Sequence, residues 1–394
     1  MRRAAAAAAA ALGRRTLRTH AAAETRPAAP AWAGPRPPPP PPHQHQPILS
    51  RLLDGTLLDE AAVATLARRG WLVLDGALPL PDGPAQLAAS VRAAAPFLTP
   101  NASIFVDPAT GEHARLAKVG VDEAEPGVGA NPALDAACPA LVGLREEAAS
   151  LGSLVSALAP AGSALASLGG AGAVKAQIAC GQRTGDDGDG GSGASTPLRG
   201  GFALHADADE ALDGRRLTLT LYPAALPPGA GGGGELLLYP SLDPDAPPVA
   251  IPPAPGRAVL FSACRLPHAV AASAGERLCV SVWLGVRGRG LPPPPPPTPV
   301  AAVLRGLVGV RPDVVRRTVL AEPDARRALG RARLGRVWEA TMAAAHAPGP
   351  ALETALDRGR AERAALGRAF EAVGLDWRAA GLGEAAGDPA PEWF

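Results

Sequence analysis

Residues 202–222 read FALHADADEALDGRRLTLTLY, and residues 257–284 read RAVLFSACRLPHAVAASAGERLCVSVWL. Within them, residues 217–222 place leucines on one face of an extended chain and threonines with Tyr222 on the other. Residues 277–284 alternate in the same way. A period of two residues is typical of a β-strand with two different environments. These stretches therefore predict at least two strands, each with a polar face that can line a pocket.

Further strand candidates surround this pair. Residues 174–180, 235–239 and 257–262 are short apolar segments, and Asp213-Gly214, the glycine run at 231–234 and proline-rich turns separate the strands. Many short strands divided by such turns indicate a double-sheet jelly roll or a barrel-like sandwich. Helices are expected on both sides of this region, so the predicted class is α+β.

Three residues in the β region can bind a metal ion. His205 and Asp207 are two apart on a predicted strand, so both side chains project from one face, and His268 follows after enough chain for several strands to return. Two imidazoles and one carboxylate hold Fe(II) on one face and leave the opposite positions open. A His-x-Asp pair or a lone Pro267-His268 is more often a surface turn. Their order within one β region favours a metal site.

Arg277 and Tyr222 are candidates for binding an organic acid beside the metal. Arg277 shares a strand face with Trp283, and a guanidinium can hold a carboxylate through two parallel hydrogen bonds. Tyr222 lies on the polar face of its own strand, where its hydroxyl could share that carboxylate. Alone, Arg277 would be read as a solvated strand residue and Tyr222 as a packing residue.

These motifs resemble the prolyl 4-hydroxylase-like branch of the 2-oxoglutarate and Fe(II)-dependent dioxygenases. The resemblance is specific over residues 174–286. It is carried by Leu204-His205-Ala206-Asp207, Asp213-Gly214-Arg215-Arg216-Leu217-Thr218, Tyr222, Gly233-Gly234-Glu235-Leu236, Arg257-Ala258-Val259-Leu260-Phe261-Ser262, Pro267-His268 and residues 277–283. The chain departs from the family at Cys180-Gly181, where relatives often carry a tyrosine, and in the Asp/Gly/Ser-rich stretch that follows. That departure concerns contacts to the substrate.

The resemblance implies a double-stranded β-helix that holds iron on His205, Asp207 and His268. Arg277 would pair with the side-chain carboxylate of 2-oxoglutarate, assisted by Tyr222. The cofactor would be Fe(II), with 2-oxoglutarate and O₂ as cosubstrates and ascorbate as a further candidate. The implied activity couples decarboxylation of 2-oxoglutarate to hydroxylation of an unactivated C–H bond, with a prolyl residue of a protein or peptide as the first substrate candidate.

Two other functions remain open at this point. A non-catalytic sensor or scaffold could bind iron and 2-oxoglutarate and use the polyproline segments or the helical tail to engage partners. A cupin-like isomerase or metal-binding protein would not use 2-oxoglutarate and would leave Arg277 without a role. Succinate production and 2-oxoglutarate binding discriminate between these functions.

Composition excludes several classes of partner. The net charge of the 394 residues is +1, from 38 basic and 37 acidic residues, which gives no footprint for nucleic acid or an anionic membrane. The four cysteines form no C-x-x-C pair, so a disulfide framework is not expected. Cys264 is expected to be a buried thiol rather than part of a zinc site, and His113 and His346 are expected to be exposed. No run is apolar and long enough to predict a membrane span.

The amino terminus has the composition of a targeting segment. Residues 1–20 contain arginines and many alanines but no acid, which is typical of a mitochondrial or plastid transit peptide. A secretory signal or a cytoplasmic location with a disordered tail is the alternative. A proline-rich linker follows, so residues 1–47 are assigned to targeting peptide and linker.

The remaining chain divides into four predicted parts. Residues 48–173 form a support with helices at 61–69, 84–95 and 148–166, a strand at 71–74 and an irregular stretch at 97–121. Residues 174–290 form the dioxygenase domain, with a flexible surface loop predicted at 181–201. Residues 291–299 are a polyproline linker. Residues 300–394 form a C-terminal helical appendage with helices at 300–320, 323–346 and 352–375.

Overall fold

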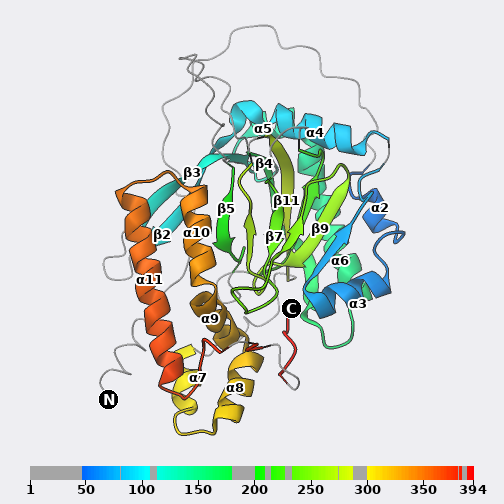
Figure 1. Ribbon diagram of the computed structural model, residues 1–394. Helices are drawn as coiled ribbons and strands as arrows, with labels where there is room; N and C mark the ends of the chain where they lie inside the picture. The colour runs from blue at the N-terminus through cyan, green and yellow to red at the C-terminus, as the bar shows by residue number, and fades with distance from the viewer. Residues whose placement is uncertain are drawn as a thin grey trace, which may run out of the picture.

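Figure 1 shows the computed structural model of the protein. It describes residues 47–79, 81–106, 113–179, 200–208, 214–226, 233–273, 275–286, 300–379, 381–383 and 388–394. The predicted targeting segment, the polyproline linker, most of the loop predicted at 181–201, and Cys180 lie outside these residues.

Among the described residues, seven antiparallel strands form a large sheet. In spatial order they are β1 (Trp71–Leu74), β9 (Arg257–Ser262), β6 (Arg215–Tyr222), β11 (Arg277–Val286), β4 (Leu168–Ala179), β3 (His113–Ala124) and β2 (Thr99–Val106). A second sheet of four strands has the order β5 (Phe202–His205), β10 (His268–Val270), β7 (Leu236–Leu238) and β8 (Val249–Ile251).

The two sheets pack face to face. Tyr222, Phe261 and Cys279 of the large sheet share one buried cluster with Leu236 and Leu238 of the small sheet. Strands that cross from one sheet to the other and back, with the interior between them, form a double-stranded β-helix. The predicted jelly-roll fold and α+β class are confirmed.

Alternation along β6 places its polar face inside the sandwich. Leu217, Leu219 and Leu221 belong to the cluster packed under the helices, whereas Tyr222 belongs to the cluster between the sheets. Thr218 is buried on the Tyr222 face. The face predicted to line a pocket therefore points into the space between the sheets.

Helices before β4 cover the outer face of the large sheet, where α6 lies against β4 and β11 (Figure 1). They are α2 (Ser50–Leu53), α3 (Glu60–Arg69), α4 (Gly83–Ala93), α5 (Pro132–Ala137) and α6 (Pro139–Leu158), with short 3-10 turns η1 (Ala95–Phe97) and η2 (Ala164–Ser167). The Asp59 side chain caps α3 by accepting a hydrogen bond from the Ala62 amide, and Gly70 ends it in the left-handed conformation.

The C-terminal helices pack beside the small sheet, with α10 lying against β5 and alongside α11 (Figure 1). They are α7 (Val300–Gly306), α8 (Pro312–Ala321), α9 (Pro323–Arg333), α10 (Gly335–Ala345) and α11 (Pro350–Glu371). Arg333 joins them to the β region, because its Nε donates to the carbonyl of Leu242 at 2.7 Å and its Nη1 donates to that of Trp377 at 2.6 Å.

Several predicted elements differ from the structure. The stretch at 97–121, read as irregular, contains β2 and most of β3. The helix predicted at 148–166 begins earlier and ends as α6 before Pro160, which cannot continue it. Two of the long helices predicted after residue 300 are each divided in two, the first at Pro312 and the second around Leu334.

The prediction that His346 is exposed was wrong, because this residue is buried. Its Nδ1 lies 2.9 Å from the carbonyl oxygen of Met342, and its Nε2 lies 3.0 Å from the hydroxyl of Ser103. Burial lowers the pKa of His346, so the ring is a neutral link between α10 and β2.

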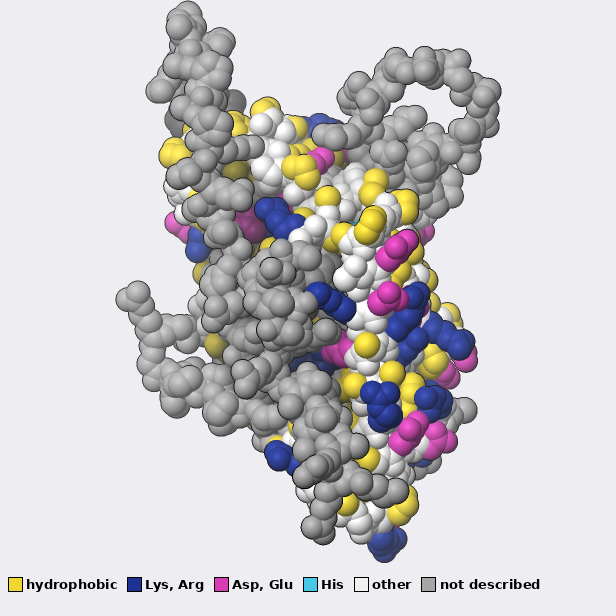
Figure 2. Space-filling view, turned by 90° about the vertical axis from the view of Figure 1, so that its left-hand side faces the viewer, with side chains coloured by type: hydrophobic (Ala, Val, Ile, Leu, Met, Phe, Trp, Pro, Cys, Tyr) yellow, Lys and Arg dark blue, Asp and Glu magenta, His cyan; other side chains and the backbone are white. Residues whose placement is uncertain are grey.

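The described surface carries charges of both signs. Figure 2 shows Lys and Arg side chains intermingled with Asp and Glu side chains over the described part of one face. Ion pairs of this kind join α10 to α11, with Arg363 Nη1 2.8 Å from Glu339 Oε1. Among the described helices, none has the length and apolarity to span a membrane.

Candidate metal and organic-acid site

The three predicted metal ligands converge between the two sheets. His205 ends β5 and His268 begins β10, and these residues are register partners in the small sheet. Asp207 lies in the turn after β5, so it is not on the strand as predicted. One ligand atom from each residue lies within 4.8 Å of the others. The Nε2 atoms of His205 and His268 lie 3.4 and 3.5 Å from Asp207 Oδ1.

Neighbouring groups orient each of these side chains. His205 Nδ1 lies 2.7 Å from the carbonyl oxygen of Ala203, and His268 Nδ1 lies 3.1 Å from that of Leu266. A carbonyl can only accept, so each Nδ1 carries the proton and each Nε2 presents a lone pair toward the centre. The hydroxyl of Thr218 donates to Asp207 Oδ2 at 2.6 Å. Oδ1 is therefore the carboxylate oxygen left for a cation.

The directions of the pKa shifts of His205 and Asp207 suit a cation at this centre. Burial lowers the pKa of His205, the charge of His268 lowers it further, and Asp207 acts in the opposite direction. Burial alone would raise the pKa of Asp207, but the two imidazoles hold it well below the usual range for a carboxyl group. Neutral imidazole and ionised carboxylate are the ligand forms that a divalent metal requires.

Arg277 begins β11 and is almost fully buried, with 3% of its surface exposed. Its Nη1 donates to the sulfur of Cys279 at 3.3 Å, whereas its Nε and Nη2 are buried without any hydrogen-bond partner. Nε and Nη2 form one edge of the guanidinium, which is the edge that binds a carboxylate through two parallel hydrogen bonds. A buried cation with that edge unused fits an acidic ligand.

Tyr222 ends β6 and is buried beside Arg277. Burial raises the pKa of its phenol, although the charge and hydrogen bonding of Arg277 act to lower it. The hydroxyl therefore stays protonated at neutral pH and can act as a donor beside the guanidinium.

Lys118 of β3 lies in the same region and was not predicted. Its Nζ lies 4.0 Å from the centre of the Phe202 ring, the Arg277 guanidinium lies 5.9 Å from that ring, and His205 stacks at 6.3 Å between centroids. Burial lowers the pKa of Lys118 to about 8, and Asp207 is among the charges that act on it. Two cations therefore surround one phenyl ring beside the metal ligands.

A polar network continues along the inner face of the large sheet. Glu123 accepts hydrogen bonds from Asn101, from Lys175 at 2.9 Å and from Gln177 at 3.3 Å. The Nζ of Lys175 also lies 5.6 Å from the ring centre of Trp283. Trp283 is the register partner of Thr218, which binds Asp207, so the network reaches the metal ligands.

Two buried polar atoms in this network have no partner. They are Nε1 of Trp283, which can only donate, and Oδ1 of Asn101, which can only accept. Trp283 therefore offers an unused donor and Asn101 an unused acceptor.

The three described cysteines, Cys138, Cys264 and Cys279, belong to no cluster that could hold a metal ion. Cys264 is a buried thiol, as predicted, and donates to the carbonyl of Arg215 at 3.0 Å; Cys279 is buried as well. Across the ranges that the structure describes, His205, Asp207 and His268 form the one cluster able to hold a metal ion.

Residues 194–285 match a family model described as the 2OG-Fe(II) oxygenase superfamily. That segment contains all three clustered ligands, Tyr222 and Arg277. Over this segment the chain is similar to the 2OG-Fe(II) oxygenase superfamily. Members of this superfamily use Fe(II), 2-oxoglutarate and O₂, and the donor set and the unpaired edge of Arg277 in this chain fit those groups.

Comparison with solved structures finds proteins that are similar to this chain. A prolyl 4-hydroxylase from Phytophthora capsici is 18% identical, with a TM-score of 0.51 over 86% of this chain and 97% of that chain. A Trichoplax adhaerens prolyl hydroxylase, in complex with a hypoxia inducible factor oxygen degradation domain peptide fragment, is 18% identical with a TM-score of 0.40, covering 57% and 87%. The epimerase SnoN from nogalamycin biosynthesis is 16% identical with a TM-score of 0.36, covering 61% and 91%. No curated protein sequence matched the chain.

Proposed function

We propose that this protein is a 2-oxoglutarate-dependent hydroxylase in which His205, Asp207 and His268 hold Fe(II), and Arg277 with Tyr222 binds 2-oxoglutarate. The observation that carries the proposal is the unpaired Nε and Nη2 edge of Arg277, buried in the same interior as the three ligands. An unneutralised guanidinium in that position is costly unless an acid binds it. A pure scaffold, which binds neither iron nor 2-oxoglutarate, would have no need of either feature.

The residues of the chain position and protect the reacting groups. The carbonyls of Ala203 and Leu266 fix the two imidazoles, and Thr218 fixes the carboxylate of Asp207. Phe261 packs its ring against His268 at 4.7 Å and helps exclude water from that side. When bound, iron and 2-oxoglutarate supply the activation of O₂ that ends in hydroxylation of a C–H bond.

Lys118 adds a second positive charge to the cosubstrate pocket. Its Nζ and the Arg277 guanidinium approach the same Phe202 ring. Two carboxylates act on Lys118: Glu123, which is already paired with Lys175, and the metal ligand Asp207. 2-Oxoglutarate carries two negative charges, and the pocket supplies two cations besides the metal. We therefore assign Lys118 a role in binding or attracting the dianion.

A prolyl residue in a peptide or protein is the substrate that we propose. The sequence resemblance to prolyl 4-hydroxylases supports this choice. The side chain of His205 is 36% exposed, compared with 4% for His268, so the approach to the metal lies on the His205 side. The unpartnered Trp283 Nε1 and Asn101 Oδ1 suit a peptide group, which offers both an acceptor and a donor.

Peptide hydroxylation under ¹⁸O₂ tests this substrate. The protein, with Fe(II) and 2-oxoglutarate, is incubated with a panel of proline-containing peptides and with matched peptides in which alanine replaces proline. One ¹⁸O atom gained by the proline peptides alone supports the proposal. Oxygen gained by the alanine peptides equally, or by neither set while a non-peptide substrate is hydroxylated, refutes a prolyl substrate but leaves the oxygenase assignment intact.

A further inference from the structure

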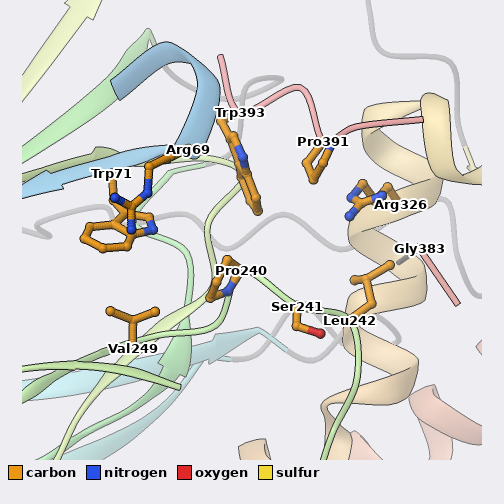
Figure 3. A pocket seen from close by; sticks show the side chains of 10 residues that line it. All are labelled: Arg69, Trp71, Pro240, Ser241, Leu242, Val249, Arg326, Gly383, Pro391 and Trp393. Carbon is orange, nitrogen blue, oxygen red and sulfur yellow. The ribbon is translucent and has the colours of Figure 1, made fainter. Parts of the chain in front are cut away.

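A second cavity lies between the β region and the C-terminal helices (Figure 3), and none of the metal ligands lines it. Its volume is about 410 Å³, within the range of small-molecule sites. Trp71 at the start of β1 and Trp393 near the C-terminus form aromatic walls, and Pro240 and Leu242 after β7 form another side. Arg326 of α9 lies across the cavity from Trp71.

Close contacts fix the aromatic walls. The indole of Trp393 lies directly on Gly70, where an added Cβ would come within 2.5 Å of the indole Cγ. The hydroxyl of Ser262 donates to the carbonyl of Trp393, and the side chain of Arg265 donates to that of Glu392 at 3.0 Å. The segment that carries Trp393 is therefore held against the β region. Rigid indole walls suit a flat apolar body.

The charged residues that line the cavity are both basic. Arg69 stacks its guanidinium on Trp71, 3.9 Å from the ring centre, and Arg326 approaches from the opposite side. No acidic residue lines the cavity among the described residues.

The guanidinium of Arg326 is partly unpaired. Its Nη1 is buried without a hydrogen-bond partner. Asp388 is the nearby carboxylate, but its oxygens already accept from Arg316 Nε at 2.8 Å, from Arg316 Nη2 at 2.6 Å and from the Gly383 amide at 3.0 Å. A buried, unpaired guanidinium nitrogen beside a cavity calls for an anionic partner.

We infer that this cavity is a second binding site, which takes a small organic anion whose carboxylate or phosphate meets Arg326 and whose flat apolar body lies between Trp71 and Trp393. The site shares no described residue with the metal and organic-acid site. Its ligand is therefore different from the cosubstrate, and its occupancy does not depend on the oxygenase activity proposed above.

Titration calorimetry with naphthalene-2-carboxylate tests the inference, and neutral naphthalene-2-carboxamide serves as the matched probe. We expect saturable binding of the carboxylate, about tenfold tighter than the carboxamide, because only the anion pairs with the guanidinium. Arg326→Met should remove that preference and leave carboxamide binding unchanged. Arg317→Met, a substitution on the exposed face of α8, is the control and should change neither affinity.

Further arms separate this site from the cosubstrate pocket. Binding of the carboxylate should persist in Arg277→Leu and in saturating 2-oxoglutarate. If Arg326→Met fails to fold, Arg69→Met replaces it, because Arg69 is at an exposed position. This variant is also expected to bind the carboxylate probe more weakly. The inference is overturned by equal affinity for the two probes, by absence of saturable carboxylate binding, by an unchanged preference in both arginine variants, or by competition with 2-oxoglutarate.

Discussion

The hydroxyl of Thr218 donates a hydrogen bond to Asp207 Oδ2 at 2.6 Å, which leaves Oδ1 facing the two histidines. Thr218 comes from the large sheet, whereas His205 and His268 belong to strands of the small sheet. The hydrogen bond therefore fixes the carboxylate across the interior of the sandwich. Positioning of this kind governs how well a ligand set binds metal.

Thr218→Val should weaken metal binding by about tenfold or more, because valine keeps the shape but cannot hold Asp207. The measurement is the affinity for Fe(II) under nitrogen, or for Mn(II) as a redox-stable substitute. Thr220→Val is the matched control on the same strand face, because the Thr220 hydroxyl does not bond to Asp207. The metal affinity of this variant should equal that of the wild type. Equal loss in both variants would mean that burial, rather than the Asp207 contact, matters.

Arg277→Gln should weaken 2-oxoglutarate binding by about 10- to 100-fold, because it removes a charged pair of hydrogen bonds that contributes about 1.5–3 kcal/mol. The measurement is calorimetry on the Mn(II)-loaded protein. Metal affinity should stay unchanged, and Arg277→Lys should recover part of the loss through its charge. A variant that loses metal and 2-oxoglutarate together would contradict the assigned role.

Lys118→Met should raise the Kd for 2-oxoglutarate by about tenfold, since one of two cations facing the dianion is lost. Lys118 and Lys175 are the two lysines of the chain, so Lys175→Met is the natural control. Lys175 is paired with Glu123, and its loss should lower stability without changing the Kd.

Lysine acylation gives an independent test of Lys118. A pKa near 8 makes the amine reactive at mildly alkaline pH, and bound 2-oxoglutarate should protect it while Lys175 is modified as before. Protection of neither lysine, with 2-oxoglutarate bound, would place Lys118 outside the pocket.

Glu123→Gln should lower the free energy of unfolding by about 1–3 kcal/mol near neutral pH. Burial acts to raise the pKa of Glu123, but Lys175, Asn101 and Gln177 together hold it below 4.5. A lowered pKa gives stability that is present above the unfolded value of 4.5 and is lost as pH falls through the folded value. The difference between wild type and variant in urea unfolding should therefore shrink in acid. A constant difference at all pH values would show that the charge of Glu123 is unimportant.

The ligand set and the fold could be predicted because each depends on local patterns. Alternation in residues 217–222 gives the face of β6, and the His-x-Asp pair at 205–207 with His268 in the same β region indicates a set of metal ligands. The capped helix α3 was predicted for a similar reason, since Asp59 and Gly70 are signals within a few residues of its ends.

The positions of Lys118 and Asn101 near the site could not be predicted, because they depend on pairing between strands that are distant in the sequence. β2 and β3 form by pairing with each other and with β4, and their sequence lacks a clear alternation. Gly120 has a φ of 69° inside β3, which interrupts the alternation. As a result Lys118 and Val121, which an uninterrupted strand would place on opposite faces, both reach Phe202. A single lysine between Leu116 and Val121 was the available signal.

The burial of His346 also depends on tertiary contacts. The helix pattern of α10 was visible, but the contact between His346 and Ser103 joins strands and helices that are distant in the sequence. The second cavity could not be predicted from the sequence either, because Trp71, Arg326 and Trp393 come from three separate segments.

Succinate formation from 2-oxoglutarate is the most direct test of the central claim. Wild type and His205→Ala are compared with and without Fe(II), in air and under nitrogen, in the presence of the proline peptide panel. The account predicts succinate that requires iron and oxygen and disappears in His205→Ala, in step with peptide oxidation. Succinate formed at an equal rate by His205→Ala, or tight 2-oxoglutarate binding without succinate under every condition, would contradict it.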